Sequence, residues 1–319
     1  MTDKKGSAMR VAILGAGAMG SIFGAELTSH GVDTLLIDVN APLVNRLNHD
    51  GVVIRRGDKE RQVRVRATID PKGEGPVDLL VVFVKCWATD DAMKLAAPLI
   101  GGDTSVLSLQ NGWGNGEKIA RHVPDNRVLL GVTYHSGTVT GLGVVDHTAV
   151  GSSYIGPHRG NDLAAARAIA SSFTDAGLPT EATAEIIGKV WRKLMLNVSA
   201  NPVAALTGLR SGQLMQDPHV DRLMTGLARE AVAVARASGH PFDAEETIAY
   251  VRQSLHAAGP ATASMRQDVM AGRPTEIDVI TGAIIEAAES HGIDVPLNRA
   301  IHALIKGYEA ARPDPGKVA

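Results

Sequence analysis

The chain has 319 residues, of which 45% are hydrophobic and 21% charged, a composition typical of a globular protein of about two domains. The formal net charge of −2 and the 3% of aromatic residues provide neither the basic surface nor the stacking side chains of a nucleic-acid-binding protein. The single cysteine, Cys86, excludes an intramolecular disulfide and a thiolate zinc cluster, and it fits a reducing cytoplasm.

The apolar runs of this chain are short. Leu79–Val84, one of the longest, is far below the roughly 20 residues of a membrane-spanning helix, and no apolar run of signal-peptide length opens the chain. The sequence therefore predicts a cytoplasmic protein without a membrane segment. We expect residues 1–7 and 312–319 to be loose ends.

The first half of the sequence alternates short β-branched runs with helix-like stretches. The predicted strands are 10–14, 33–37, 79–84, 104–109, 128–132, 138–146 and 153–155, and the predicted helices are 21–30, 42–48, 90–99 and 116–121. Residues 52–54 and 63–67 are rich in valine and predict an inserted hairpin. Strands separated by helices are typical of parallel βαβ units, so we predict an open α/β sheet with helices on both faces.

From about residue 184 onward the pattern is helical throughout. The predicted helices are 186–199, 220–238, 244–255, 264–272, 276–291 and 298–311. Gly239 and Gly292 follow helical runs, and a proline comes soon after each of them, as is usual where helices end. We therefore predict an α/β domain over residues 9–183 and an all-helical domain over residues 184–312.

The turn between the first predicted strand and helix has the pattern GxGxxG. Gly15 permits a tight turn, Gly17 lets the backbone approach a pyrophosphate, and Gly20 lets the helix pack against the strand. The first helical turn, which includes Ala18 and Met19, offers free N–H groups to the anion. The sequence thus predicts an N-terminal Rossmann-type dinucleotide-binding domain, with a glycine-rich turn that binds no ligand as the alternative.

Asp38 ends the second predicted strand, 18 residues after Gly20. An acid at about this spacing hydrogen-bonds the ribose 2′-OH of NAD, and it would repel the 2′-phosphate of NADP. We therefore predict that NAD(H) is preferred over NADP(H). Two readings stay open: Asp38 could cap a helix, and Arg55 and Arg56 of the predicted hairpin could approach the adenine end of the cofactor and weaken the preference.

Several short segments with characteristic patterns follow in order along the chain. They are Val84–Trp87 (VKCW), Gln110–Gly114 (QNGWG), Trp191–Pro202 (W-x-K-L-x-x-N-x-x-x-N-P), Ser264–Asp268 (SMRQD) and Thr275–Asp278 (TEID). With the glycine turn, this set resembles the ketopantoate reductases (2-dehydropantoate 2-reductases) over about residues 9–311. The resemblance implies a Rossmann domain followed by a helical domain like the C-terminal domain of 6-phosphogluconate dehydrogenase. It also implies NAD(P)H-dependent reduction of 2-dehydropantoate, a step of pantothenate biosynthesis.

The same resemblance implies roles for individual residues. Lys193 would be the proton donor and Glu276 a second catalytic residue beside cofactor and substrate. Besides the glycine turn, the residues implied to contact the cofactor are Lys85, Asn111, Gly137 and Glu276. The residues implied to hold the substrate are Asn111, Lys193, Asn197, Asn201 and Ser264.

The chemistry of ketone reduction explains why a lysine is expected at such a site. Hydride transfer to a ketone leaves negative charge on the oxygen, so a proton donor must lie within hydrogen-bond reach. A lysine ammonium can donate, and partial desolvation lowers its pKa toward neutrality. Lys193, Asn197 and Asn201 are spaced i, i+4 and i+8, which places them on one helix face.

Each of these residues also has a purely structural reading. Lys193 could be a solvated helix lysine, Asn201 could end its helix before Pro202, and Glu276 could stabilise a helix N-terminus through the macrodipole. We interpret His135 and His147 as structural or, at most, substrate-side, because they lack the spacing of metal ligands, and we expect no metal.

Four positions depart from the family pattern. A basic residue is usual where this chain has Asp38, and an apolar one is common at Arg266. Some family members carry a substrate-side asparagine at Ser211, and Trp113 is bulkier than expected. An extra arginine could bind the carboxylate of another 2-oxo acid.

Three functions therefore remain in competition. The first is reduction of 2-dehydropantoate or a close 2-oxo acid. The second is NAD-dependent oxidation of a different small hydroxy acid by a member of the same family, and the third is dinucleotide binding without catalysis. We expect a small-molecule 2-oxo acid substrate, no nucleic acid or membrane partner, and a homodimer formed through the helices after residue 220.

Overall fold

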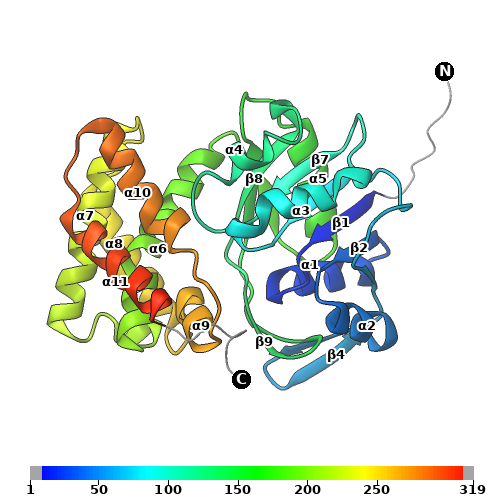
Figure 1. Ribbon diagram of the computed structural model, residues 1–319, viewed down its shortest axis with the longest axis horizontal. Coiled ribbons are helices and arrows are strands. Elements are labelled where there is room, and N and C mark those ends of the chain that lie inside the picture. The colour runs from blue at the N-terminus through cyan, green and yellow to red at the C-terminus, as the bar shows by residue number, and fades with distance from the viewer. Residues whose placement is uncertain (1–8, 312–319) are drawn as a thin grey trace. The chain divides into compact units, whose positions relative to one another are not determined.

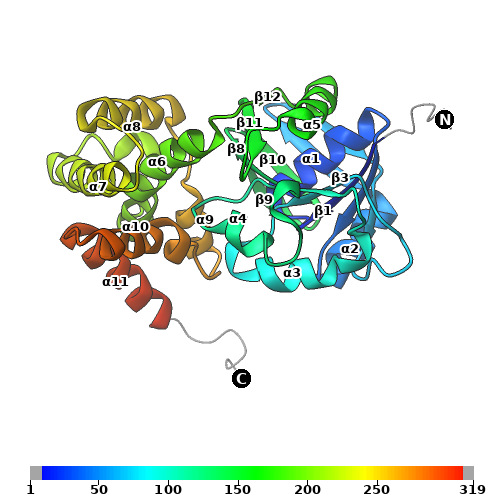
Figure 2. The same cartoon turned by 90° about the horizontal axis from the view of Figure 1, so that it is seen from above.

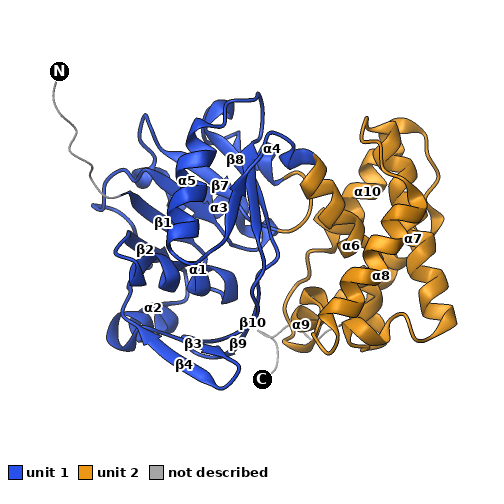
Figure 3. Ribbon diagram, turned by 180° about the vertical axis from the view of Figure 1, so that it is seen from behind, with its two compact units in different colours: residues 1–110, 115–187 blue, residues 111–114, 188–319 orange. Residues whose placement is uncertain are grey.

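The computed structural model describes residues 9–311, and both predicted loose ends lie outside this range. The chain divides into two compact units, which Figure 3 distinguishes by colour. Unit 1 comprises the residues up to 110 and residues 115–187, and unit 2 comprises residues 111–114 and those from 188 onward. The predicted domain ranges, 9–183 and 184–312, remain a prediction.

Within residues 9–311, unit 1 is built on an eight-stranded sheet. Its strands run in the order β12 (Thr180–Ala182), β11 (Ser153–Pro157), β8 (Val128–Thr133), β7 (Ser105–Ser108), β6 (Leu79–Val82), β1 (Arg10–Leu14), β2 (Asp33–Ile37) and β5 (Arg66–Thr68). All neighbouring pairs are parallel except β8 with β11. The strand order reverses between β1 and β6, the point at which open α/β sheets bind ligands beyond the carboxyl ends of their strands.

Helices cover both faces of this sheet, as predicted (Figures 1 and 2). They are α1 (Ala18–Ser29), α2 (Ala41–Asp50), α3 (Thr89–Leu95), α4 (Asn115–Ile119) and α5 (Ala164–Asp175), with 3₁₀ turns η1 (Cys86–Ala88), η2 (Ala97–Leu99) and η3 (Asp125–Arg127). Val11 and Ile13 of β1 pack in one hydrophobic core with α1 and α5. Ala12 and Leu14 point to the opposite face and pack with α3 and α4. Alternate side chains of β1 thus pack into two hydrophobic cores, one on each face of the sheet.

A second sheet has four strands, in the order β4 (Lys59–Val63), β3 (Val52–Arg56), β10 (Val144–Ala149) and β9 (Ser136–Gly141). The predicted hairpin exists, but its second strand is β4, and residues 66–68 pair instead with β2 in the main sheet. The predicted single strand 138–146 is wrong, because a turn at Gly143, whose φ is +72°, divides it into β9 and β10. A left-handed φ there favours glycine.

Helix α5 and strand β12 are not among the elements predicted from the sequence. The apolar residues of α5, Ala166, Ile169, Ala170 and Phe173, are all buried. Their spacing of i, i+3, i+4 and i+7 is the pattern of an amphipathic helix, so the signal was present in the sequence.

Unit 2 is helical throughout its described residues. It contains α6 (Ile186–Thr207), α7 (Pro218–Ala237), α8 (Ala244–Ala258), α9 (Ser264–Met270), α10 (Ile277–His291) and α11 (Pro296–Ala310), with a 3₁₀ turn η4 (Ser211–Gln213). No helix in the described part of the chain combines the length and hydrophobicity needed to cross a bilayer.

Helix α6 extends beyond its predicted end. Asn201 does not terminate it, since the helix continues through Pro202 to Thr207. Proline removes one backbone hydrogen bond from a helix interior. Ala200, Val203 and Ala204 are buried in the core of unit 2. This burial stabilises the helix on both sides of Pro202 and compensates for the lost hydrogen bond.

Candidate active site

The three glycines of the first turn have distinct surroundings in unit 1. Gly15 has a φ of +94°, and a Cβ there would lie 2.9 Å from the backbone nitrogen of Val84. A Cβ at Gly20 would overlap the carbonyl oxygen of Gly15. A Cβ at Gly17, by contrast, would have no protein atom within 4 Å. Packing therefore requires glycine at the first and third positions, and only a ligand would require it at the second.

The N-terminus of α1 suits an anion. Its N-cap residue is Gly17, no side chain caps the helix, and its first turn contains no acidic residue. The N–H groups of this turn, which begins with Ala18 and Met19, therefore carry the positive end of the helix dipole without a side-chain partner. This arrangement fits the pyrophosphate of a dinucleotide.

Asp38 lies beside this turn and is held by two backbone groups. Its Oδ2 accepts a hydrogen bond from the Ala16 amide at 2.8 Å, and its Oδ1 accepts one from the Asn40 amide at 3.0 Å. Asn40, not Asp38, caps the following helix, α2. Among residues 9–311, no lysine or arginine forms an ion pair with Asp38, and Arg55 instead pairs with Glu60 at 2.7 Å.

Lys85 follows β6 and precedes the η1 turn, so it stands at the carboxyl end of a central strand. The side chain of Gln110 fixes this segment: its Nε2 donates to the Val84 carbonyl and to the Thr89 hydroxyl, both at 2.8 Å. No role for Gln110 is predicted from the sequence. Its position directly before Asn111 was the available signal.

Gly137, in β9, lies against the first turns of α1. A Cβ there would lie 2.6 Å from Cδ1 of Ile22 and 3.4 Å from Cβ of Ala18. Glycine at this position therefore lets the backbone of β9 approach the helix that starts at the glycine turn.

His135 and His147 form a buried pair in unit 1, with Nδ1 of the first 3.0 Å from Nε2 of the second. Burial lowers the pKa of His135 to about 4, so this imidazole is neutral at physiological pH. The His135 ring also contacts Phe23 of α1 edge-on, which ties β9 and β10 to that helix. Among the described residues, no group of three or more His, Cys, Asp or Glu side chains is placed to hold a metal ion.

In unit 2, α6 carries Lys193, Asn197 and Asn201 along one face. Asn197 and Asn201 are each 7% exposed, and Nδ2 of Asn201 lies 3.4 Å from Oγ of Ser264 at the start of α9. Lys193 is partly buried. Burial lowers its pKa to about 8, and the nearby Glu276 carboxylate opposes that shift. The structure thus brings Lys193 close to Glu276, and Asn201 close to Ser264.

Glu276 is 6% exposed and occupies the N-cap position of α10 without making a side-chain cap. The preceding residue is held in place, because the Thr275 amide donates to Oε1 of Glu309 on α11 at 2.8 Å. Glu276 is therefore a buried carboxylate in a fixed segment, and its side chain makes no hydrogen bond that caps the helix.

The predicted substrate residue Asn111 belongs to unit 2, although the chain on both sides of residues 111–114 belongs to unit 1. The Trp113 amide donates to the Val279 carbonyl of α10 at 2.9 Å. Trp113 also packs against Trp191 of α6, with 5.2 Å between ring centroids.

Two of the departures from the family pattern lie in unit 2 as well. Nη1 of Arg266 on α9 is buried and has no hydrogen-bond partner among the described residues. Ser211 is buried in η4.

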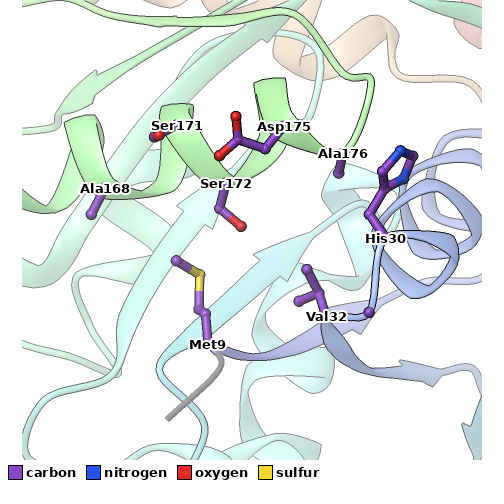
Figure 4. A pocket seen from close by; sticks show the side chains of 9 residues that line it. Met9, His30, Val32, Ala168, Ser171, Ser172, Asp175 and Ala176 are labelled. Carbon is purple, nitrogen blue, oxygen red and sulfur yellow. The ribbon is translucent and has the colours of Figure 1, made fainter. Parts of the chain in front are cut away.

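A separate hollow of about 470 Å³ in unit 1 is lined in part by Met9, His30, Val32, Ser172 and Asp175 (Figure 4). Met9 and Val32 precede β1 and β2, so this hollow lies at the amino ends of the strands. The glycine turn follows β1 and lies at the carboxyl ends, where α/β sheets bind their ligands.

Comparison with known proteins identifies two matching family models. The model described as "Ketopantoate reductase PanE/ApbA" matches residues 11–160, and "Ketopantoate reductase PanE/ApbA C terminal" matches residues 185–309.

Individual relatives agree with these matches. A 2-dehydropantoate 2-reductase of Halobacterium salinarum is 33% identical over 93% of this chain and 98% of its own length. The ternary structure of D-mandelate dehydrogenase with NADH and anilino(oxo)acetate superimposes with a TM-score of 0.91 at 28% identity, over 95% of this chain and 99% of that one. A PanE/ApbA family ketopantoate reductase of Ralstonia eutropha has a TM-score of 0.84 at 32% identity, over 95% of this chain and 99% of that one.

Proposed function

Because the chain belongs to the ketopantoate reductase family, we propose that it reduces 2-dehydropantoate to pantoate with a nicotinamide dinucleotide. The observation that carries this proposal is the pKa of Lys193, about 8, on a helix face shared with two buried asparagines and close to Glu276. A protein that only bound the dinucleotide would need the glycine turn alone. Oxidation of a different hydroxy acid is not favoured, since several relatives matched over nearly their whole length are named 2-dehydropantoate 2-reductase.

The proposed mechanism assigns the proton to Lys193. The nicotinamide, when bound, supplies the hydride that reaches the 2-oxo carbon. The Lys193 ammonium polarises the carbonyl and then donates its proton to the oxygen on which negative charge develops. With a pKa of about 8, this group is mostly protonated at pH 7 yet gives up its proton far more readily than an exposed lysine. The Glu276 carboxylate favours the charged form of Lys193 before transfer.

Substrate binding is assigned to neutral polar groups. Asn197, Asn201 and Ser264 would hydrogen-bond the carboxylate and hydroxyl oxygens, and Asn111 would contact both substrate and cofactor. A buried side-chain amide left without a hydrogen-bond partner costs about 1–3 kcal/mol. Hydrogen bonds to a polar substrate would therefore explain why α6 carries Asn197 and Asn201 on this buried face.

The test is a steady-state assay that follows NADH consumption with 2-dehydropantoate and a panel of other 2-oxo acids. We expect Lys193→Ala to lower kcat on the best substrate by about 10²- to 10⁴-fold, the usual contribution of a positioned general acid. Arg192→Ala is the matched control, because it removes an exposed cation one residue away on the same helix. Near-wild-type kcat for Lys193→Ala would refute the catalytic assignment.

We further propose that NAD(H) is preferred over NADP(H). The supporting observation is the charge of Asp38, which is fixed by two backbone amides and neutralised by no ion pair within residues 9–311. Lys85, Gly137 and the glycine turn complete the proposed cofactor site in unit 1.

The cofactor proposal predicts the effect of Asp38→Asn. This change keeps an acceptor for the Ala16 amide and removes the charge, so we expect kcat/KM for NADPH to rise relative to that for NADH by about tenfold. Measuring kcat/KM with both cofactors on both proteins checks it. A wild-type protein that prefers NADPH would contradict the proposal.

Two remaining expectations complete the proposed function. We propose that the protein acts in the cytoplasm, as the single cysteine suggests, and that it forms a homodimer through helices after residue 220.

A further inference from the structure

Residues 111–114 leave unit 1 and return to it within four residues, yet they pack with unit 2. The segment contains Asn111, the residue to which the proposed function assigns contact with substrate and cofactor. We call residues 111–114 the strap. Because the chain on either side of the strap belongs to unit 1, contacts with the helices of unit 2 must hold it in place.

The first attachment is to α10 through the backbone. The Trp113 amide donates to the Val279 carbonyl at 2.9 Å. A Cβ at Gly112 would lie 2.5 Å from that same oxygen and 2.5 Å from Cγ2 of Val279, and Gly112 has a φ of +86°. Glycine is therefore required for this close approach. Val279 lies three residues after Glu276 in the chain.

The second attachment is to α6 through aromatic rings. The Trp113 ring packs against Trp191 with 5.2 Å between centroids, and both rings contact His240, at 6.4 Å and 5.1 Å. Trp191 is 2% exposed, so Trp113 packs against a buried side chain. Trp191 lies two residues before Lys193 and so on the opposite side of α6. The Trp113 ring therefore packs against the side of α6 that faces away from Lys193.

We propose that Trp113 is a positioning residue, which fixes Asn111 in register with Lys193 and Glu276 by clamping residues 111–114 between α6 and α10. This inference rests on the proposed function. In this proposal Trp113 makes no contact with the substrate, and its effect on catalysis passes through Asn111. The bulky side chain at this position, unexpected from the family pattern, thus has a structural purpose in this chain.

The test combines kinetics with hydrogen exchange on the full-length protein. Trp113→Ala should lower kcat/KM for the 2-oxo acid by about tenfold to hundredfold, the scale expected when a substrate contact is misplaced by about 1 Å. Trp113→Phe keeps an aromatic face against Trp191 and should restore most of the loss. Met270→Ala, which removes an exposed apolar side chain of the same unit, should leave kcat/KM unchanged.

A double-mutant cycle separates positioning from simple destabilisation. If Trp113 acts through Asn111, the variant carrying both Asn111→Ala and Trp113→Ala should lose no more than Asn111→Ala alone. Losses that multiply would overturn the proposal, as would wild-type kcat/KM for Trp113→Ala.

Hydrogen exchange gives a readout that does not depend on activity. The backbone amide of residue 113 donates to the Val279 carbonyl, and it should exchange at least tenfold faster in Trp113→Ala than in the wild-type protein. An unchanged exchange rate would also overturn the proposal. A wild-type protein that reduces no 2-oxo acid would instead refute the proposed function and with it the catalytic role of the strap. If the amide of residue 113 nevertheless exchanges faster in Trp113→Ala, Trp113 holds residues 111–114 in place although the proposed reaction is wrong. Failure of the proposed function and failure of this inference therefore give different results.

Discussion

The charge of Lys193 depends on two opposing influences within unit 2. Burial lowers its pKa to about 8, and the Glu276 carboxylate raises it. Burial is the larger of the two effects. The result is an ammonium that is still protonated at pH 7 but that titrates in the range where an enzyme can use it, as expected of a general acid.

This balance predicts a pH dependence for reduction. Because the donor must be protonated, kcat/KM for the 2-oxo acid should be constant below about pH 7 and fall as the pH rises through about 8. Measuring kcat/KM from pH 6 to pH 10 at saturating NADH checks this prediction.

Glu276→Gln tests the second influence on that profile. Removing the carboxylate removes the influence that raises the lysine pKa, so the midpoint should move to lower pH. A midpoint near 10 in the wild-type protein would contradict the lowered pKa of Lys193.

At the scale of elements, two glycines at the junction of β1 and α1 are required for different reasons, one for packing and the other for the ligand. Gly20 lies where a side chain would overlap the backbone of Gly15, whereas Gly17 faces space that no protein atom fills. The two glycines look equivalent in the sequence but carry different constraints.

Two alanine substitutions should therefore have opposite signatures. Gly20→Ala overpacks the junction, so we expect its Tm to fall by at least about 5 °C. Gly17→Ala has a compatible backbone, with φ −67°, and should keep a wild-type Tm while raising the Kd of NADH by at least about tenfold. Thermal melts and titration of NADH fluorescence check both. Unchanged NADH binding by Gly17→Ala would argue against a pyrophosphate at this turn.

At the scale of the whole molecule, α11 presents an apolar stripe to solvent. Leu297, Leu304 and Tyr308 are 37%, 60% and 43% exposed, and their spacing of i, i+7 and i+11 places them on one helix face. Such a stripe is typical of a surface covered in an assembly.

The proposed homodimer gives this stripe a role. Light scattering should report a mass near twice the 33.4 kDa of one chain, and Leu304→Glu should shift it toward one chain by burying an unpaired charge. Glu245→Ala, on α8, is an exposed control. A wild-type mass of 33.4 kDa would exclude the dimer.

The parts of this protein that local pattern determines could be predicted from the sequence. The glycine turn, the alternation of β1 between two cores and the shared face of Lys193, Asn197 and Asn201 all follow from spacing along a strand or helix. Spacing acts over a few residues, and it fixes which side chains share a face before any long-range contact forms.

Only the tertiary structure decided the features that depend on residues distant in the chain. The pairing of β5 with β2, the passage of α6 through Pro202 and the clamp of Trp113 between Trp191 and Val279 each rest on such contacts. Burial against partners far away in sequence outweighs local preference at these points, and no short stretch of sequence contains both sides of the contact. The shared helix face of Lys193, Asn197 and Asn201 could thus be predicted from spacing, whereas the contacts that hold residues 111–114 against α6 and α10 were a property of the folded chain.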